Sequence, residues 1–211
     1  MMPGARASRG RRRLTRAALL LLVPLLLTGV VNVPARGTQP PQTPATLDRQ
    51  PEIRLINPDR DAPALQRIEE WRERLPEKYQ HRNNFAWAVA RIDGLEKTEY
   101  FAHSGIQSLG KISDEAAAPI AAISLRPKHG RFEILCVNHD DEIEGDNCWP
   151  RNVDTEYKII EDMARHLPDT AVRGRVRLYT DLYPCASCRH VMGQFLAAYT
   201  NIQMQVLYRE R

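Results

Sequence analysis

The clearest pattern of apolar and polar positions lies in the last third of the chain. DTEYKIIEDMARHL places apolar residues three and four positions apart, a spacing that predicts a helix with one buried face. RVRLYTDLY predicts a strand, PCASCRHVMGQFLAAY a helix that begins at Pro184, and NIQMQVLYRER a final strand. Helix, strand, helix and strand in this order require crossover connections, which favour a partly parallel sheet covered by helices. The pattern therefore predicts an α/β fold with three layers.

Further elements are predicted upstream. PALQRIEEWRERLPEK opens with Pro63 and carries four large apolar residues roughly on one stripe, which predicts a helix. NNFAWAVARIDGLEKTEYFAHSG alternates large and small apolar residues around Gly94, so it predicts a hairpin with strands at about 85–92 and 98–103. RFEILCV, residues 131–137, predicts a strand, and the acidic NHDDEIEGDN after it predicts a solvated loop.

The N-terminal residues have the composition of a targeting segment. The first sixteen residues carry six arginines and no acid, and an apolar run broken by Pro24 follows over residues 17–31. A basic start, a short apolar centre and a small-residue exit predict an export signal over residues 1–35 that is removed. An uncleaved membrane anchor is the alternative, because the apolar length overlaps the low end of that class. With the signal removed, we expect no stable membrane insertion.

Prolines divide a polar stretch that follows the predicted signal. Few large apolar residues occur over residues 36–64, so this stretch cannot bury enough surface to offset its ordering entropy. The composition predicts a disordered, proline-rich linker over residues 36–64 and one folded domain over residues 65–211.

The net charge of +4 comes from the leader. The chain has 30 basic and 26 acidic residues, but seven arginines and no acid lie in the first 37 positions. Subtracting these seven leaves 23 basic residues against 26 acidic ones, a net of −3. The pI of about 9.0 therefore does not by itself indicate nucleic-acid binding.

Two helix starts carry the candidate chemistry. Cys185 and Cys188 lie in the first turn of one predicted helix, where the positive end of the dipole favours thiolates. A second helix begins about thirty residues earlier with Asp154-Thr155-Glu156. If both helices enter from one sheet edge, Asp154 and the two cysteines supply three ligands for a tetrahedral zinc, leaving the fourth position to water. Glu156 is then placed to handle the protons of that water.

Other interpretations of these residues stay open. The two cysteines of CxxC also suit a structural zinc, a disulfide or a thiol–disulfide oxidoreductase. Asp154 is a favoured N-cap residue, and Glu156 a favoured first-turn acid. The occurrence of both motifs, D-x-E and PCxxC, at two helix starts in one chain favours the catalytic zinc site over these alternatives.

The spacing of these residues resembles a known family. Asp154-x-Glu156 followed by Pro184-Cys185-x-x-Cys188 resembles the H-x-E…P-C-x-x-C signature of zinc-dependent nucleobase deaminases, with Asp in place of His. The order of elements is similar to the cytidine deaminase-like fold, and residues 83–211 resemble the deaminase domains of bacterial polymorphic toxins. The resemblance implies a mixed sheet with helices on both faces, zinc as the cofactor, hydrolytic deamination with Glu156 as the proton carrier, and a protective immunity protein as partner.

Six more residues are assigned candidate roles. In an exported chain the cysteines on either side of the acidic loop predict a disulfide, Cys136–Cys148, with two free cysteines as the alternative. His103 in the AHSG turn and Tyr183 before the PCxxC motif are candidates for bordering the base, against a surface histidine and a packing tyrosine. Arg151 and Asn152, before the DTE helix, are candidates for contacting phosphate or base.

The sequence thus predicts an exported, zinc-dependent deaminase of the bacterial toxin type. The expected substrate is cytosine in single-stranded nucleic acid, and the expected place of action is the cytoplasm of a second cell after secretion. A deaminase of free nucleosides or nucleotides, a thiol–disulfide oxidoreductase and a catalytically inactive deaminase fold used for binding are the alternatives.

Overall fold

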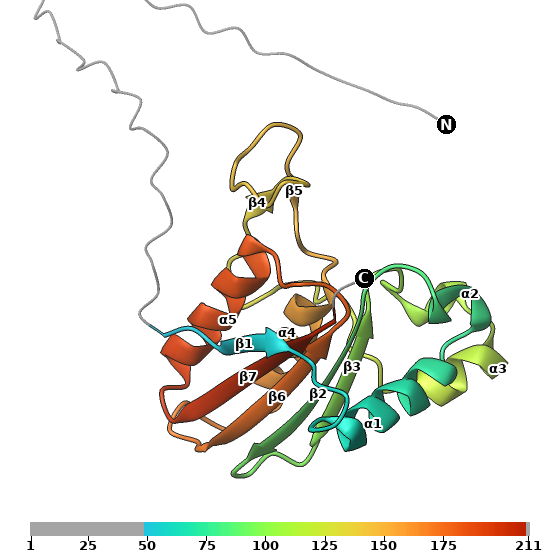
Figure 1. Ribbon diagram of the computed structural model, residues 1–211, viewed down its shortest axis with the longest axis horizontal. Coiled ribbons are helices and arrows are strands. Elements are labelled where there is room, and N and C mark those ends of the chain that lie inside the picture. Colours follow the sequence, from blue (N-terminus) through green and yellow to red (C-terminus); the bar gives the residue numbers. More distant parts are fainter. Residues whose placement is uncertain (1–48, 210–211) are drawn as a thin grey trace, which may run out of the picture. The chain divides into compact units, whose positions relative to one another are not determined.

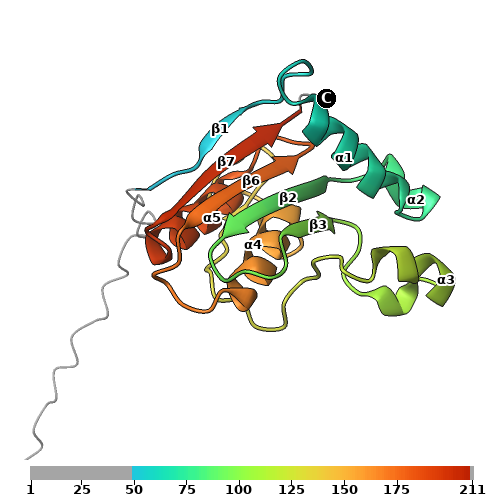
Figure 2. The ribbon, with the colours of Figure 1, turned by 90° about the horizontal axis from the view of Figure 1, so that it is seen from below.

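A computed structural model describes residues 49–209 of the chain (Figures 1 and 2). The export signal predicted over residues 1–35 and the first part of the predicted linker lie outside the described residues. In residues 49–209, none of the helices has the length and apolar character needed to cross a membrane.

The described residues form one five-stranded mixed sheet and a separate two-stranded ribbon (Figure 1). The strand order in the sheet is β1-β7-β6-β2-β3, with β1, β7 and β6 parallel and β2 antiparallel to both of its neighbours. The strands of the sheet are β1 (Glu52–Leu55), β2 (Phe85–Ile92), β3 (Glu99–His103), β6 (Gly174–Thr180) and β7 (Ile202–Tyr208), and those of the ribbon are β4 (Cys136–Val137) and β5 (Trp149–Pro150).

Helices cover both faces of the sheet. On one face α4 and α5 pack against the alternate apolar residues of β2, β6 and β7, and on the other α1 covers part of the surface (Figure 2). This arrangement confirms the predicted three-layer α/β fold. The helices are α1 (Ala62–Glu73), α2 (Glu77–Gln80), α3 (Asp114–Ala117), α4 (Thr155–His166) and α5 (Ala186–Ala198), with single 3-10 turns η1 (Leu109–Lys111) and η2 (Ala118–Ile120).

Helix α4 is buried more completely than its amphipathic pattern predicts. Every residue from 155 to 164 is buried, because the helix lies between the sheet and the segment 124–135 that crosses its outer side. The polar side chains on that outer side have partners there. Glu161 accepts hydrogen bonds from the backbone N–H groups of Arg131 and Phe132, and Asp162 accepts one from the Ser124 hydroxyl. Buried polar groups that are satisfied in this way cost little.

Residues 49–64, predicted as part of the linker, are ordered, and this part of the prediction is wrong. Residues 52–55 form β1, which pairs in parallel with β7 at the sheet edge. The Arg49 guanidinium donates to the backbone carbonyls of Leu196, Thr200 and Ile202 at 2.7, 2.7 and 2.9 Å. Backbone pairing and these contacts hold the segment without a large apolar side-chain contribution, which is why composition alone mispredicted it.

The predicted strand over residues 131–137 is also largely wrong. Only β4 is a strand, and it pairs with β5 outside the main sheet. In the residues before β4, backbone N–H groups donate to side chains of α5. The N–H of Glu133 donates to Gln194, and the N–H of Leu135 donates to Ser187. Because helix side chains satisfy these donors, this segment needs no neighbouring strand.

Candidate metal and catalytic site

Two helix N-termini meet where β6 ends. Asp154 is the N-cap residue of α4 and Cys185 is the N-cap residue of α5. Asp154 Oδ2 lies 3.3 Å from Cys185 Sγ and 3.4 Å from Cys188 Sγ. The structure therefore brings together the three residues predicted as zinc ligands, although 31 or more positions separate Asp154 from the cysteines.

The spacing of these three donor atoms suits zinc. With Zn–O near 2.0 Å and Zn–S near 2.3 Å, tetrahedral angles place a ligand oxygen and a ligand sulfur about 3.5 Å apart. The two observed S···O distances are within 0.2 Å of that value, and all three ligand atoms lie within 4.8 Å of one another. One carboxylate and two thiolates are accepted zinc ligands, and three protein ligands leave a fourth position for water, as in catalytic sites.

The electrostatics of the site also favour a cation. Hydrogen bonding to Cys185, burial and the neighbouring negative charges of Glu156 and Asp154 raise the pKa of the Cys188 thiol. As thiols, both cysteines donate to the Asp154 carboxylate. A bound divalent cation reverses this preference, because it deprotonates a coordinating thiol outright.

Glu156 lies beside this ligand set with its carboxylate held at both oxygens. Glu156 is only 2% exposed. The Thr155 hydroxyl donates to Oε2 at 2.7 Å, and the Thr180 hydroxyl donates to Oε1 at 3.0 Å. The carboxylate is therefore positioned by the first turn of α4 and by the last residue of β6.

Asn84, just before β2, holds both of these hydroxyls. Its side-chain N–H groups donate to Thr155 Oγ1 at 2.8 Å and to Thr180 Oγ1 at 2.9 Å. Its carbonyl oxygen accepts from the backbone N–H of Leu182 at 3.2 Å. One amide thus connects three elements behind the Glu156 carboxylate, so each hydroxyl proton is directed toward Glu156.

Burial, first of all, and the nearby charge of Asp154 raise the pKa of Glu156, although the threonine hydroxyls oppose the shift. A carboxyl group with a raised pKa is a stronger base once ionised and a better proton donor near neutral pH than an ordinary glutamate. Proton transfer is therefore the chemistry for which this side chain is suited.

The three candidate zinc ligands and Glu156 line one cavity of about 520 Å³. The residues around it come from the start of β2, the end of β3, the β4–β5 ribbon, the start of α4 and the β6–α5 loop. They are Asn83, Asn84, Ser104, His139, Asp141, Trp149, Arg151, Asp154, Glu156, Leu182, Tyr183, Cys185 and Cys188.

Comparison with protein-family models decides the family. The model described as Toxin-deaminase, the BURPS668_1122 family of deaminases, matches residues 68–210. The chain belongs to this toxin-deaminase family. The match spans most of the chain, including the three candidate zinc ligands and Glu156, and it confirms the predicted resemblance to cytidine deaminase-like toxins. Neither the curated proteins nor the solved structures gave a match.

The structure places the three predicted substrate contacts of this toxin deaminase differently. Tyr183 lines the cavity and is 54% exposed, with its ring edge-on to Tyr208. Asn152 lies in the turn before α4 and is not among the residues that line the cavity. His103 is fully buried outside the cavity, its Nε2 bound to the Arg82 carbonyl and its Nδ1 accepting from the Gly105 N–H, so its ring is not available to a substrate.

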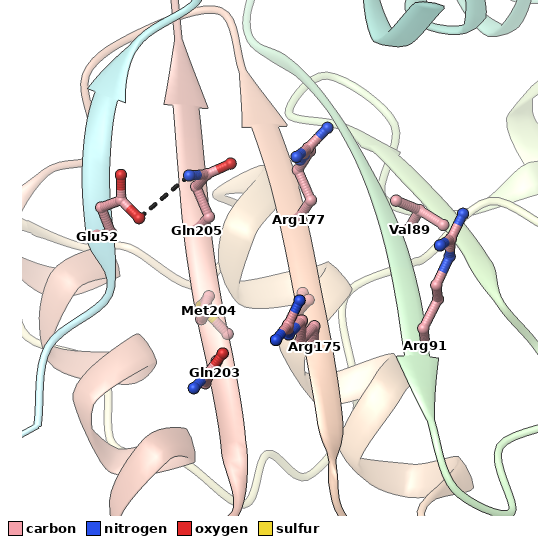
Figure 3. Close-up of a pocket in the computed structure, with 9 residues that line it drawn as sticks. Glu52, Val89, Arg91, Arg175, Arg177, Gln203, Met204 and Gln205 are labelled. Atoms are coloured by element: carbon pink, nitrogen blue, oxygen red, sulfur yellow. Dashed lines mark hydrogen bonds between the residues drawn. The ribbon is translucent and has the colours of Figure 1, made fainter. Parts of the chain in front are cut away.

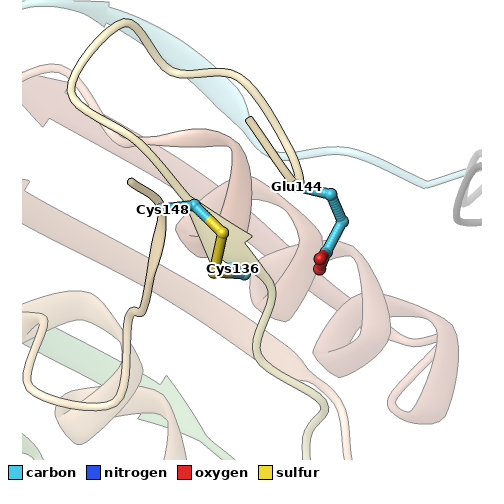
Figure 4. Close-up of side chains that lie close together, drawn as sticks. All are labelled: Cys136, Glu144 and Cys148. Atoms are coloured by element: carbon cyan, nitrogen blue, oxygen red, sulfur yellow. A yellow bond between two sulfur atoms is a disulfide. The ribbon is translucent and has the colours of Figure 1, made fainter. Parts of the chain in front are cut away.

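The acidic loop is closed by a disulfide and contacts the start of α5. Cys136 and Cys148, the predicted pair, are joined by a disulfide with their Cα atoms 5.3 Å apart (Figure 4). Within the loop, Asp141 accepts from the backbone N–H of Ala186 at 2.6 Å and pairs with Arg189 at 2.9 Å. The loop predicted as solvated thus forms one wall of the cavity, and its Asp141 carboxylate satisfies an unpaired N–H at the helix terminus.

A buried ion pair supports the β6–α5 loop from the other face of the sheet. Arg72 of α1 donates to both carboxylate oxygens of Asp181 at 3.2 and 2.7 Å. Asp181 also accepts from the Tyr179 hydroxyl and the Phe85 N–H. Because Asp181 lies four residues before Cys185, this pair fixes the loop that delivers both thiols.

A second concave surface, of about 400 Å³, lies over strands β1, β7, β6 and β2 on the sheet face that α1 covers only in part (Figure 3). Exposed Arg91, Arg175 and Arg177 line it, with Arg91 directly opposite Arg175 in the antiparallel pair. No cysteine or histidine lines this surface, and its arginines are on the face opposite α4 and α5. The candidate reaction site is therefore the cavity at the helix N-termini.

Sequence reasoning missed the residues that position Glu156. Asn84 and Thr180 carry no motif, and Thr155 is the unspecified residue of the D-x-E signature. One usable signal existed. Thr180 ends the strand just before the PCxxC segment, and polar residues at the carboxyl ends of parallel strands commonly face the site.

Proposed function

We propose that this toxin deaminase is a zinc-dependent hydrolytic enzyme that converts cytosine in single-stranded nucleic acid. The observation that carries the proposal is the convergence of Asp154, Cys185 and Cys188 on one point beside the buried Glu156 carboxylate. Three zinc ligands, one proton carrier and a cavity open to solvent are the parts that hydrolytic deamination of a base requires.

The roles of the residues follow from their positions. Asp154, Cys185 and Cys188 would hold zinc, which when bound supplies an acidified water at neutral pH. Glu156 accepts a proton from water at its carboxylate and passes it to the ring nitrogen of the base. After the new C–O bond at C4 has formed, Glu156 carries the second water proton from the new hydroxyl to the amino group, so that the C–N bond breaks and the amino group leaves as ammonia. Thr155 and Thr180 keep the carboxylate in place throughout.

Burial of the site supports a base that has left its stack. Because Glu156 is almost fully enclosed, a base inside a duplex cannot bring C4 to it, whereas an unpaired or extruded base can. The net charge of −3 outside the leader also disfavours tight binding to long duplexes. The choice of cytosine rests on the resemblance to cytidine deaminases, and adenine and free nucleotides are separated from it by the assay below.

Export and toxicity belong to the same proposal. A structural disulfide such as Cys136–Cys148 is typical of proteins that pass through an oxidising compartment. Together with the basic, apolar leader, it supports secretion of the chain and action in the cytoplasm of a second cell. An enzyme that alters bases endangers its producer, so we include a protective immunity protein as its partner.

The thiol–disulfide oxidoreductase alternative fits less well. A redox-active CxxC pair requires a thiolate at its attacking cysteine. Both cysteines face Asp154, whose negative charge disfavours a thiolate when no metal is bound.

Zinc content and base conversion test the proposal together. The purified full chain is assayed for zinc by atomic emission and for conversion of cytosine or adenine in single-stranded DNA, single-stranded RNA and free nucleotides. We expect about one zinc per chain and conversion of cytosine in a single strand. Glu156→Gln should abolish conversion and keep the zinc, whereas the exposed control Glu115→Gln should change neither. A zinc-free chain whose disulfide exchange survives Glu156→Gln would replace the proposal with the oxidoreductase.

A further inference from the structure

Exposed apolar side chains are concentrated at the rim of the active-site cavity. In the described part of the chain, five large apolar residues are exposed, and three of them, Trp149, Leu182 and Tyr183, line this cavity. Exposed apolar surface gathered at one site is informative because scattered single residues are the normal case. Tyr183 already contacts Tyr208, whereas Trp149 has no aromatic neighbour within residues 49–209.

Trp149 is held rigidly although the residue is 41% exposed. It follows the disulfide-bonded Cys148 directly, and as part of β5 it pairs with Val137 of β4. The Arg151 guanidinium carbon lies 4.2 Å from the centre of the indole ring. A ring fixed in this way loses little conformational entropy when a ligand stacks on it.

Arg151 adds a positive charge at the same rim. Its Nη2 donates to the Asn138 carbonyl at 3.1 Å, and its Nε is buried without a hydrogen-bond partner. Among the described residues, Arg151 forms no ion pair with a carboxylate, unlike Arg189 of α5, which pairs with Asp141. The cavity rim therefore combines a rigid indole with an arginine whose charge is not neutralised.

We propose that Trp149 and Arg151 form a subsite for the nucleotide next to the target base. The base of that neighbouring nucleotide stacks on the indole face that Arg151 leaves free, and the Arg151 charge attracts the adjoining phosphate. Stacking on an aromatic ring tolerates any base, so the subsite selects a polynucleotide strand rather than a particular sequence. This inference rests on the proposed deaminase function and narrows its substrate to strands over free nucleotides.

A role in packing alone is the competing explanation. Trp149 lies next to the disulfide, so its removal could loosen the loop and alter the cavity for every substrate. The two explanations differ in which substrate is affected. A stacking subsite matters for an oligonucleotide and not for a mononucleotide, whereas a loosened cavity affects both.

Binding and turnover are therefore measured separately on the full chain. Binding uses a fluorescein-labelled single strand of about ten nucleotides with one cytosine, as DNA and as RNA, titrated by anisotropy in the Glu156→Gln background. Turnover uses the unlabelled strand and the matching cytidine monophosphates. The variants are Trp149→Ala, Trp149→Phe and Arg151→Gln, with Ile143→Ala as the matched control, because Ile143 is 39% exposed on the same loop but does not line the cavity.

Loss of one stacked base weakens binding by roughly tenfold. We expect Trp149→Ala to raise the Kd for the strand by about that factor, while its turnover of the mononucleotide stays within about twofold of the parent. Trp149→Phe should retain most of the binding and Ile143→Ala all of it. Arg151→Gln should lower the salt dependence of log Kd by roughly the 0.7 expected for one phosphate contact on a single strand.

The other outcomes distinguish a failure of the proposed subsite from a failure of the proposed deaminase function. Equal losses of strand and mononucleotide turnover in Trp149→Ala, or unchanged strand binding, would overturn the subsite. A parent chain that converts mononucleotides and does not bind strands would overturn the subsite and the single-stranded substrate, while zinc-dependent hydrolytic deamination stands. Strand binding that depends on Trp149, without conversion of any substrate, would support the subsite and overturn the proposed reaction.

Discussion

The buried ion pair between Arg72 and Asp181 allows a direct test of how the fold holds the site. We consider Arg72→Met, which keeps most of the side-chain length and removes the guanidinium. Asp181 is 1% exposed and would remain buried. It would keep the Tyr179 hydroxyl and the Phe85 N–H as partners and lose both hydrogen bonds from the Arg72 guanidinium. The result is a buried carboxylate that has lost the positive charge of Arg72.

Removing one partner of a buried, hydrogen-bonded ion pair destabilises a protein by about 3–5 kcal/mol. For a domain of this size, each kcal/mol lowers Tm by about 2–4 °C. We therefore expect Arg72→Met to lower Tm by roughly 6–20 °C. Because Asp181 lies just before the PCxxC segment, loosening of this loop should also release zinc. We therefore expect the variant to lose zinc at a lower temperature than the parent.

The pH dependence gives a second signature. Burial by itself would raise the pKa of Asp181, but the hydrogen bond and charge of Arg72 hold that pKa below its usual value. The stability contributed by a carboxyl with a lowered folded pKa is present above the unfolded pKa, near 3.9, and is lost as pH falls through the folded value. In the variant, burial without the guanidinium raises the pKa. The difference in stability between parent and variant should therefore be largest near pH 7 and shrink below about pH 4.

Thermal and urea unfolding at pH 7 and pH 4 measure these effects. Arg165→Met is the control, because Arg165 is 56% exposed and lies 3.8 Å from Asp162, so its loss should cost about 1 kcal/mol or less. Adding Asp181→Asn to Arg72→Met should recover part of the loss by removing the buried charge. An Arg72→Met chain that unfolds together with the parent at pH 7 would refute the reasoning.

Three further predictions concern the site itself. Thr180→Val removes one of the two hydroxyls that hold Glu156, so kcat should fall about tenfold with little change in KM; an unchanged kcat in steady-state assays would contradict this role. Replacing Cys136 and Cys148 together by alanine opens a disulfide that spans 12 positions, which should cost about 3 kcal/mol, speed hydrogen exchange in the loop and raise KM at constant zinc content; unchanged exchange would show that the wall is held without it. Asp154→Ala should bring zinc well below one per chain by atomic emission with little loss of helix stability, because Asp154 makes no side-chain capping hydrogen bond, and full zinc retention would exclude it as a ligand.

Several parts of this protein are determined by its sequence alone. The helix at α4, the strands at β6 and β7 and the hairpin of β2 and β3 follow from spacings within single elements, which depend only on near neighbours along the chain. The D-x-E and PCxxC segments were identified for the same reason. Each places its chemistry within one turn of a helix start, and the alternation of helices and strands predicts that both starts lie at one sheet edge.

Other features were decided only by the tertiary structure. Asn84 holds Thr155 and Thr180, which lie 71 and 96 positions later in the chain, and no local pattern records such contacts. Strand β1 was missed because its order comes from backbone pairing with β7, which is independent of side-chain type. Asp141 contacts the start of α5 only because the disulfide and the fold bring the acidic loop there. Hydrogen bonds and burial between distant segments depend on how the elements pack, so the motifs predict the chemistry and the packing determines which groups hold it in place.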